Sequence, residues 1–248
     1  MKHRFPPLFD KAALAPPVLV VVAHPDDEVI GCGAMMAWHR RSGHPVTVVH
    51  VTDGAAGDPE GKFGDITEVR RREGRAALAA LGVDDVRTLG LPDGGVAEAA
   101  GRLDGDLRTL FAALQPATLY SFFYAESHRD HRAVARAVAG AADALPPACR
   151  VLLFGVNQPV SGGVMFDVSE LAEEKRRALA CYASQLAYND FAAKVLHRDH
   201  AATVNVEDPA VQHAEVFADL VPGRLPAVRE ATESVWTALY GADPEEDP

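Results

Sequence analysis

Short runs of β-branched, apolar residues alternate along the chain with longer amphipathic segments. The first run, residues 18–23, is apolar without interruption, which is the pattern of a parallel strand covered on both faces. A stretch rich in Ala, Met and Trp follows to about Ser42, and Gly43 occupies the usual C-terminal position of a helix. The alternation continues, and it predicts further strands at 46–51, 86–89, 118–123, 151–156 and 165–168 and further helices at 66–81, 102–114, 131–145, 170–182 and 226–240.

Strand–helix alternation at this spacing is typical of an α/β fold. Right-handed crossovers between successive strands give a three-layer α/β/α, Rossmann-like architecture around a mainly parallel sheet. The 248 residues are an ordinary length for one such domain, and no internal repeat or low-complexity linker divides the chain. We therefore predict a single domain over residues 17–241, with an N-terminal extension at 1–16 and an acidic tail at 242–248.

Composition argues against several classes of partner. The formal net charge is −11 at pH 7, and an anionic surface repels both nucleic acid and anionic membranes. The N-terminus carries basic residues and two prolines but no long apolar segment, which predicts a cytoplasmic protein. Three scattered cysteines are too few for a disulfide framework. The expected partner is a small molecule, and the sequence leaves the oligomeric state open, a homo-oligomer included.

The densest cluster of ionisable side chains comes directly after the first strand, at residues 24–28, His-Pro-Asp-Asp-Glu. Parallel α/β sheets bind their ligands at the carboxyl ends of the strands. Carboxylates this close together repel each other, and a divalent cation relieves the repulsion, since imidazole and carboxylate oxygen are both zinc ligands. The alternative is a solvated helix N-terminus, where acidic groups meet the helix dipole, and for Glu28 alone the two interpretations are equally good. The cluster as a whole predicts a metal site.

A second cluster, residues 128–131, His-Arg-Asp-His, follows the strand at 118–123. Its spacing lets one imidazole ligate a metal while the other faces the same cavity, and the Asp can hydrogen-bond an imidazole N–H and fix its tautomer. The same tetrapeptide recurs at 197–200. Only the first copy follows a strand pattern and opens a helix, so we assign the metal to it. The second copy is interpreted as polar sequence at the surface or at the rim of the site.

Together these motifs resemble the LmbE-like (PIG-L) N-deacetylase family. Residues 23–28 match its Ala-His-Pro-Asp-Asp-Glu signature in full, and residues 128–131 match its His-x-Asp-His signature. Two departures, Arg129 in place of a common Pro and Cys181 in place of a frequent His, bear on the substrate pocket and not on the reaction class. Smaller features of the family also agree over residues 17–220, namely Thr52–Gly54, Arg70 with Glu73, Leu81–Val83, Pro92–Gly94 and Ser184–Gln185.

The resemblance implies a zinc-dependent hydrolase that removes an acetyl group from the amine of an N-acetylglucosamine-type sugar or sugar conjugate. His24, Asp27 and His131 would hold the Zn²⁺ ion, with Fe²⁺ as the alternative metal. Asp26 would act as the general base. These roles agree with the chemistry, because zinc polarises an amide carbonyl and acidifies water, and a nearby carboxylate completes proton transfer.

Four further roles follow from the same resemblance. His128 would stabilise the tetrahedral oxyanion or assist departure of the amine, and Asp130 would orient His128. Arg70 and Asp93 would contact sugar hydroxyls. For Arg70 the alternative is a solvated position on a helix face.

Three other functions compete with sugar deacetylation. Cleavage of an amide in a sugar–thiol conjugate is the nearest one. Two His and one carboxylate also form the facial triad of non-haem Fe(II) enzymes, but a spare carboxylate beside the ligands favours hydrolysis. A non-catalytic sugar- or nucleotide-binding module with a structural metal is disfavoured, because structural zinc sites are usually closed by four protein ligands.

Overall fold

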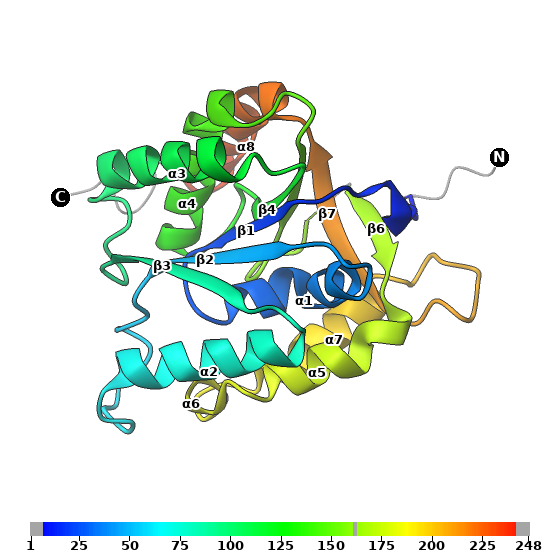
Figure 1. The fold of residues 1–248 in the computed structure, drawn as a ribbon, viewed down its shortest axis with the longest axis horizontal. Coiled ribbons are helices and arrows are strands. Elements are labelled where there is room, and N and C mark those ends of the chain that lie inside the picture. The colour runs from blue at the N-terminus through cyan, green and yellow to red at the C-terminus, as the bar shows by residue number, and fades with distance from the viewer. Residues whose placement is uncertain (1–6, 161–162, 242–248) are drawn as a thin grey trace.

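A seven-stranded sheet forms the centre of the molecule in the computed structural model, which describes residues 7–160 and 163–241 (Figure 1). The strand order is β3-β2-β1-β4-β5-β7-β6. The strands are β1 (Val18–Val22), β2 (Val46–Thr52), β3 (Asp85–Leu91), β4 (Thr118–Phe122), β5 (Arg150–Phe154), β6 (Val164–Asp167) and β7 (Ala214–Leu220).

The first five strands run parallel, and the last two are antiparallel to their neighbours. The predicted mainly parallel α/β fold is therefore confirmed. Strand β1 lies at the point where the chain order reverses, since its two neighbours are β2 and β4. Ligands of open α/β sheets bind at this switch point, outside the carboxyl ends of the strands. The motifs at residues 24–28 and 128–131 both lie there.

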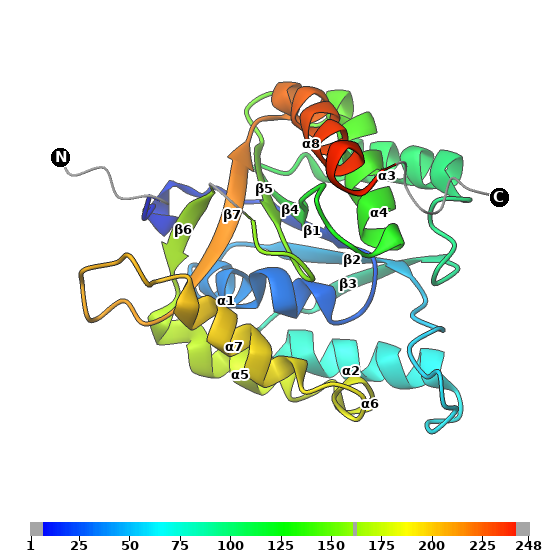
Figure 2. The ribbon, with the colours of Figure 1, turned by 180° about the vertical axis from the view of Figure 1, so that it is seen from behind.

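Helices cover both faces of the sheet and give the predicted three layers (Figures 1 and 2). No helix among the described residues is long and apolar enough to cross a membrane. One face carries α1 (Asp27–Arg41), α2 (Ile66–Ala80), α5 (Ala172–Leu179), α6 (Ala183–Leu186) and α7 (Phe191–Ala201), and the other carries α3 (Ala100–Leu114), α4 (Arg129–Gly140) and α8 (Leu225–Tyr240). Short 3₁₀ helices are η1 (Lys11–Ala13), η2 (Ala142–Ala144), η3 (Ser169–Leu171) and η4 (Pro222–Arg224).

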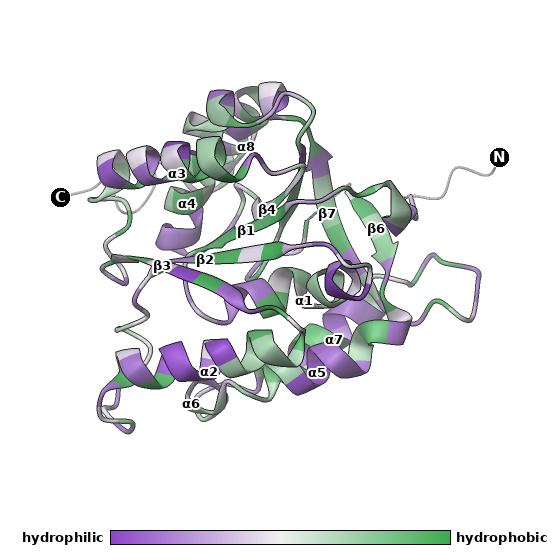
Figure 3. Ribbon diagram, in the orientation of Figure 1, coloured by the Kyte–Doolittle hydropathy of each residue, from purple (hydrophilic) through white to green (hydrophobic). Residues whose placement is uncertain are grey.

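The apolar core lies between these layers. All residues of β1 and β4 are buried, and their Val, Leu, Tyr and Phe side chains pack against helices on both sides. Figure 3 shows the same division, with hydrophobic central strands and many hydrophilic residues on the outer helices and on the edge strand β3. Continuous apolar runs therefore mark the central strands correctly, because a strand covered on both faces has no solvent side.

Two helices and one strand of the structure, α6, α7 and β7, were not predicted. Strand β7 was not predicted because Glu215 and Asp219 interrupt its apolar residues, although Glu215 is buried. Helix α7 was not predicted either, and it contains the second His-Arg-Asp-His. The interpretation of that copy as surface sequence is wrong for Asp199, which is 3% exposed.

Residues before β1 contact the edge of the sheet. The backbone at Leu8 pairs with Met165 of β6, so part of the predicted extension at 1–16 lines the sheet edge. The boundary at residue 17 stays a prediction. The predicted tail at 242–248 lies outside the described residues.

Candidate metal centre

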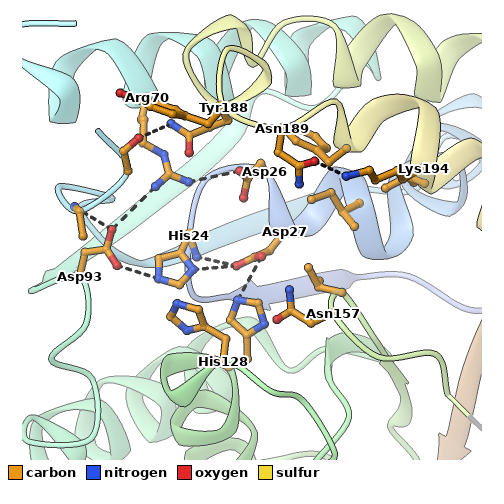
Figure 4. A pocket seen from close by; sticks show the side chains of 18 of the residues that line it. His24, Asp26, Asp27, Arg70, Asp93, His128, Asn157, Tyr188, Asn189 and Lys194 are labelled. Atoms are coloured by element: carbon orange, nitrogen blue, oxygen red, sulfur yellow. Dashed lines mark hydrogen bonds and ion pairs between the residues drawn. The ribbon is translucent and has the colours of Figure 1, made fainter. Parts of the chain in front are cut away.

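A cavity of about 590 Å³ opens at the carboxyl ends of β1 and β4 (Figure 4). Its volume is in the range of small-molecule sites. Seven of the eight predicted site residues line it, and Asp130 lies fully buried behind the His24 ring. The seven are His24, Asp26, Asp27, Arg70, Asp93, His128 and His131.

The Asp27 carboxylate lies between the two histidines predicted to bind metal. Its Oδ2 is 3.3 Å from His24 Nδ1, and its Oδ1 is 3.2 Å from His131 Nε2. Ligand atoms about 2.0–2.1 Å from a tetrahedral zinc are about 3.3–3.4 Å apart. The spacing and the N/O donor set therefore fit a divalent metal such as zinc.

Both imidazoles are held from behind by carboxylates. His24 Nε2 lies 2.9 Å from Asp93 Oδ1 and 3.2 Å from Asp130 Oδ2. His131 Nδ1 lies 2.7 Å from Glu126 Oε2, and the His131 ring stacks on Phe122 with a centroid distance of 4.2 Å. A carboxylate behind a metal-binding imidazole fixes its tautomer and raises its basicity.

Glu126 is the residue that sequence analysis missed. Its carboxylate is 1% exposed and also accepts backbone N–H groups from Val156 and Asn157. The signal was its place five residues before His131, but that spacing alone does not predict the contact.

The proton affinities of these groups reflect a surplus of negative charge. Burial disfavours the charged form of His24, but its carboxylate partners outweigh this and hold its pKa well above the ordinary value. Burial opposes the charge of His131 too, yet Asp27 and Glu126 raise its pKa to about 9. Burial would raise the pKa of Asp27, but His131 and His24 hold it well below its usual range. A site that retains protons in this way stabilises cations, and a divalent metal would replace those protons.

Other donor sets lie in the same cavity. Ligand atoms of His24, His128 and His131 lie within 4.8 Å of one another, as do those of His24, Asp93 and Asp130. The second set uses the His24 nitrogen that faces the protein, where Asp130 is fully buried and already accepts backbone N–H groups. We prefer the set with Asp27 because it uses His24 Nδ1 and His131 Nε2, and the opposite nitrogens of both rings are already held by carboxylates.

Asp26 has a strained backbone and an unusual carboxyl group. Its φ of 130° lies in a region that residues other than glycine rarely adopt. The Asp26 N–H donates to Glu28 Oε2 at 3.1 Å, and Arg70 Nη2 lies 3.3 Å from Asp26 Oδ2. Burial raises the pKa of Asp26 to about 7, even though Arg70 lowers it, and Asp27 contributes to the rise. A carboxyl group of that pKa can take and return a proton near neutrality.

Glu28 stabilises this strained turn by accepting the Asp26 N–H. It is fully buried, accepts a hydrogen bond from Tyr182 Oη at 2.5 Å and lies 3.2 Å from His50 Nε2. The alternative of a solvated helix N-terminus is therefore excluded for Glu28.

The structure corrects the predicted role of Asp130. Its carboxylate contacts His24 and the backbone N–H groups of Gly94 and Val96, and does not orient His128. Instead, the Asp130 backbone N–H donates to His128 Nδ1 at 3.2 Å, because His128 is the N-cap of α4. An accepting Nδ1 leaves the proton of the neutral ring on Nε2. Partial desolvation in the cavity, together with His131 and His24, lowers the pKa of His128, which favours that neutral ring.

Arg70 and Asp93 line the cavity, but their side chains form hydrogen bonds and ion pairs with other residues of the site. Arg70 is 4% exposed, which excludes a solvated helix face, and it donates to the carbonyl oxygens of Pro25 and Gly54. Asp93 accepts the Ala56 N–H and lies 3.8 Å from Arg70. Both residues hold the Asp26 and His24 turn in place.

The wall opposite the histidines is polar and less acidic. Lys194 Nζ donates to Asn189 Oδ1, and Figure 4 shows both beside Tyr188 on this side of the cavity. Gln185 also lines the cavity, and Asn157 adds a second amide group from the side of the histidines. Such side chains are suited to hydrogen-bonding hydroxyl groups.

Comparisons with known proteins identify the family of the chain. The PIG-L family, described as GlcNAc-PI de-N-acetylase, matches residues 19–142. A probable N-acetyl-α-D-glucosaminyl L-malate deacetylase 2 from Bacillus cereus is 30% identical over 200 residues, 74% of this chain and 91% of the relative.

Solved structures extend the likeness to the fold. An N,N'-diacetylchitobiose deacetylase from Pyrococcus horikoshii superposes with a TM-score of 0.71 at 22% identity, over 84% of each chain. A 4-carboxy-2-hydroxymuconate hydratase from Pseudomonas putida superposes with a TM-score of 0.68 at 21% identity, over 83% of this chain and 96% of the hydratase. The fold alone therefore does not determine the reaction. On its sequence, the chain belongs to the PIG-L family of de-N-acetylases.

Proposed function

We propose that this chain hydrolyses the amide of an N-acetylglucosamine-type sugar or conjugate, using a zinc ion held by His24, Asp27 and His131. One observation carries the proposal. The Asp27 carboxylate lies between two imidazoles that are each backed by a carboxylate, and the Asp26 carboxyl, with its pKa near 7, faces the same cavity. This arrangement combines a metal site with a separate group for proton transfer.

When bound, the metal supplies Lewis-acid polarisation of the amide carbonyl and lowers the pKa of water. Asp26 takes a proton from the attacking water as its oxygen bonds to the carbonyl carbon. The Nε2–H of His128 donates to the developing oxyanion. As the C–N bond breaks, Asp26 returns its proton to the leaving amine, so that the products are acetate and the free amino sugar.

The substrate class rests on the relatives and on the polar wall. The Bacillus cereus relative is named for an N-acetylglucosaminyl malate, and a Nocardioides relative, 45% identical over 85 residues, for an inositol conjugate of an acetamido sugar. The latter match covers only 29% of this chain, so it supports the sugar and not the attached group. An amide in a sugar–thiol conjugate is the alternative substrate.

Two features favour hydrolysis over the competing functions. Oxygen activation by iron needs no base, whereas Asp26 is a spare carboxyl group beside the ligands. A structural zinc site would be closed by four protein ligands, whereas this one faces a cavity of about 590 Å³.

Release of primary amine from N-acetylglucosamine, its malate conjugate and its inositol conjugate tests the proposal. The protein is assayed as purified, after metal removal, and after reloading with zinc or Fe²⁺. We expect amine release that disappears on stripping and returns with metal. A fully loaded protein that releases no amine from any conjugate would contradict the proposed reaction.

A further inference from the structure

Helix α1 carries Asp27 at its first position and is broken one turn later. Cys32 has φ −145° and ψ 26°, which divides α1 into a short first segment and a longer second one. A break of this kind leaves carbonyl groups of the first segment and N–H groups of the second without helical partners. Buried groups of this type must find other partners.

Charged side chains from two other elements satisfy both sides of the break. Arg198 Nη2 of α7 donates to the Ile30 carbonyl oxygen at 2.7 Å. Glu215 of β7 accepts the N–H groups of Ala34 and Met35, each at 2.9 Å. Both ends of the break are thus fixed to the body of the protein.

The same charges form one continuous chain. Arg198 lies 3.2 Å from Asp199. Lys175 Nζ lies 2.6 Å from Asp199 and 2.7 Å from Glu215. The side chains of Asp199, Lys175 and Glu215 are at most 4% exposed. Alternating signs compensate the cost of burying them, and removal of one member would leave an uncompensated charge.

Arg198 has a second contact that reaches the other half of the site. Its Nη1 donates to the Gly155 carbonyl oxygen at 2.9 Å. The next two residues, Val156 and Asn157, donate their N–H groups to Glu126, which in turn holds His131. A Cβ at Gly155 would lie 1.6 Å from the Gln158 oxygen, so the loop follows one tight path.

We propose that Arg198 is a positioning residue that sets the separation of Asp27 and His131. One arm of its guanidinium group fixes the α1 segment that bears Asp27, and the other fixes the loop that holds Glu126 and thus His131. This assigns a use to the second His-Arg-Asp-His. Its Arg contacts both backbone segments, and its Asp links that Arg to the buried Lys175. The inference rests on the proposed metal ligands.

Zinc affinity of the Arg198→Gln and Arg198→Lys variants tests this role, measured by competition with a chromophoric chelator. Loss of a group bonded directly to a metal ligand costs about 10–100-fold in affinity. Arg198 acts through the backbone of Ile30 and Gly155, so we expect a loss at the lower end, about tenfold, for Arg198→Gln and a smaller one for Arg198→Lys. The matched control is Arg108→Gln, since Arg108 also bonds carboxylates and a backbone carbonyl, but on α3. The control should lose stability in thermal unfolding and keep wild-type zinc affinity.

Two further measurements separate positioning from general destabilisation. The visible spectrum of the Co²⁺-loaded Arg198→Lys protein should change in intensity, because it reports ligand geometry. Added methylguanidine should restore part of the zinc affinity of Arg198→Ala. A zinc affinity of Arg198→Gln within twofold of wild type would overturn the role of Arg198 and leave the proposed metal site standing. A wild-type protein that binds zinc no better than His131→Ala would overturn the proposed metal site as well.

Discussion

Replacement of Glu126 by Gln perturbs the metal centre from outside the cavity. Glu126 Oε2 faces His131 Nδ1 at 2.7 Å, and Oε1 accepts the Val156 N–H at 2.8 Å. The Asn157 N–H lies within 3.2 Å of both oxygens. Glu126→Gln keeps the side-chain volume but replaces one acceptor by an NH₂ group. Whichever way the amide turns, that NH₂ group faces a donor.

The structure gives the size of two separate effects. A buried donor left unpaired costs about 1–3 kcal/mol, and each kcal/mol lowers the Tm by about 2–4 °C in a protein of this size. The His131 ring also loses its anionic partner, which predicts zinc affinity about 10–100-fold weaker. Glu126 does not line the cavity, so KM measured at saturating zinc should change little.

The assay pairs chelator competition for zinc with thermal unfolding of the metal-stripped protein. Glu173→Gln is the control, because Glu173 pairs with Arg176 on the exposed side of α5. We expect the control to match wild type in both measurements. Lower stability of Glu126→Gln with unchanged zinc affinity would refute the assigned role, since Glu126 would then support only the loop.

Four other predictions follow from the site and its surroundings. Asp26→Asn should lower kcat by about 10²–10⁴-fold while bound zinc, measured by elemental analysis, stays near one per chain; retained activity would show that Asp26 is not the base. His131→Ala should lose zinc and His200→Ala should not, and the opposite pattern would assign the metal to the second tetrapeptide. Burial lowers the pKa of His39 to about 3, so the stability that the neutral ring contributes is present above pH 6.5 and is lost as the pH falls toward 3. The free energy of unfolding of the metal-stripped protein, measured in urea, should fall by about 2 kcal/mol between pH 6.5 and 5, and this fall should be absent in a His39→Gln variant. Lys194→Gln should raise KM up to about fivefold for a conjugate with a carboxylate, but not for a neutral glycoside, and equal effects on both would exclude a charge contact.

Most of the strands and the place of the candidate site follow from local sequence, whereas the individual metal ligands are inferred from the family resemblance and remain a proposal. Residues 18–22 are predicted as a buried strand because each of them is apolar, and the structure buries all five. The ionisable residues after that strand lie where the topology of parallel sheets places a ligand site. Local pattern and fold rule agree here, which is why seven predicted residues line one cavity.

The missing parts depend on contacts between distant segments. Glu215 interrupts an apolar run and hides β7, because its partners Lys175 and Ala34 lie far away in sequence. Asp130 precedes His131, yet its carboxylate contacts His24 from another element. Periodicity and motif spacing describe neighbours along the chain, so they do not predict which buried charge meets which.

Anomalous diffraction at the zinc edge, from crystals of the zinc-loaded protein, tests the central claim most directly. We predict a single peak about 2.0–2.2 Å from His24 Nδ1, the Asp27 carboxylate and His131 Nε2. A peak on the other side of the His24 ring, among Nε2, Asp93 and Asp130, would contradict the assigned site, and so would the absence of any peak in this cavity.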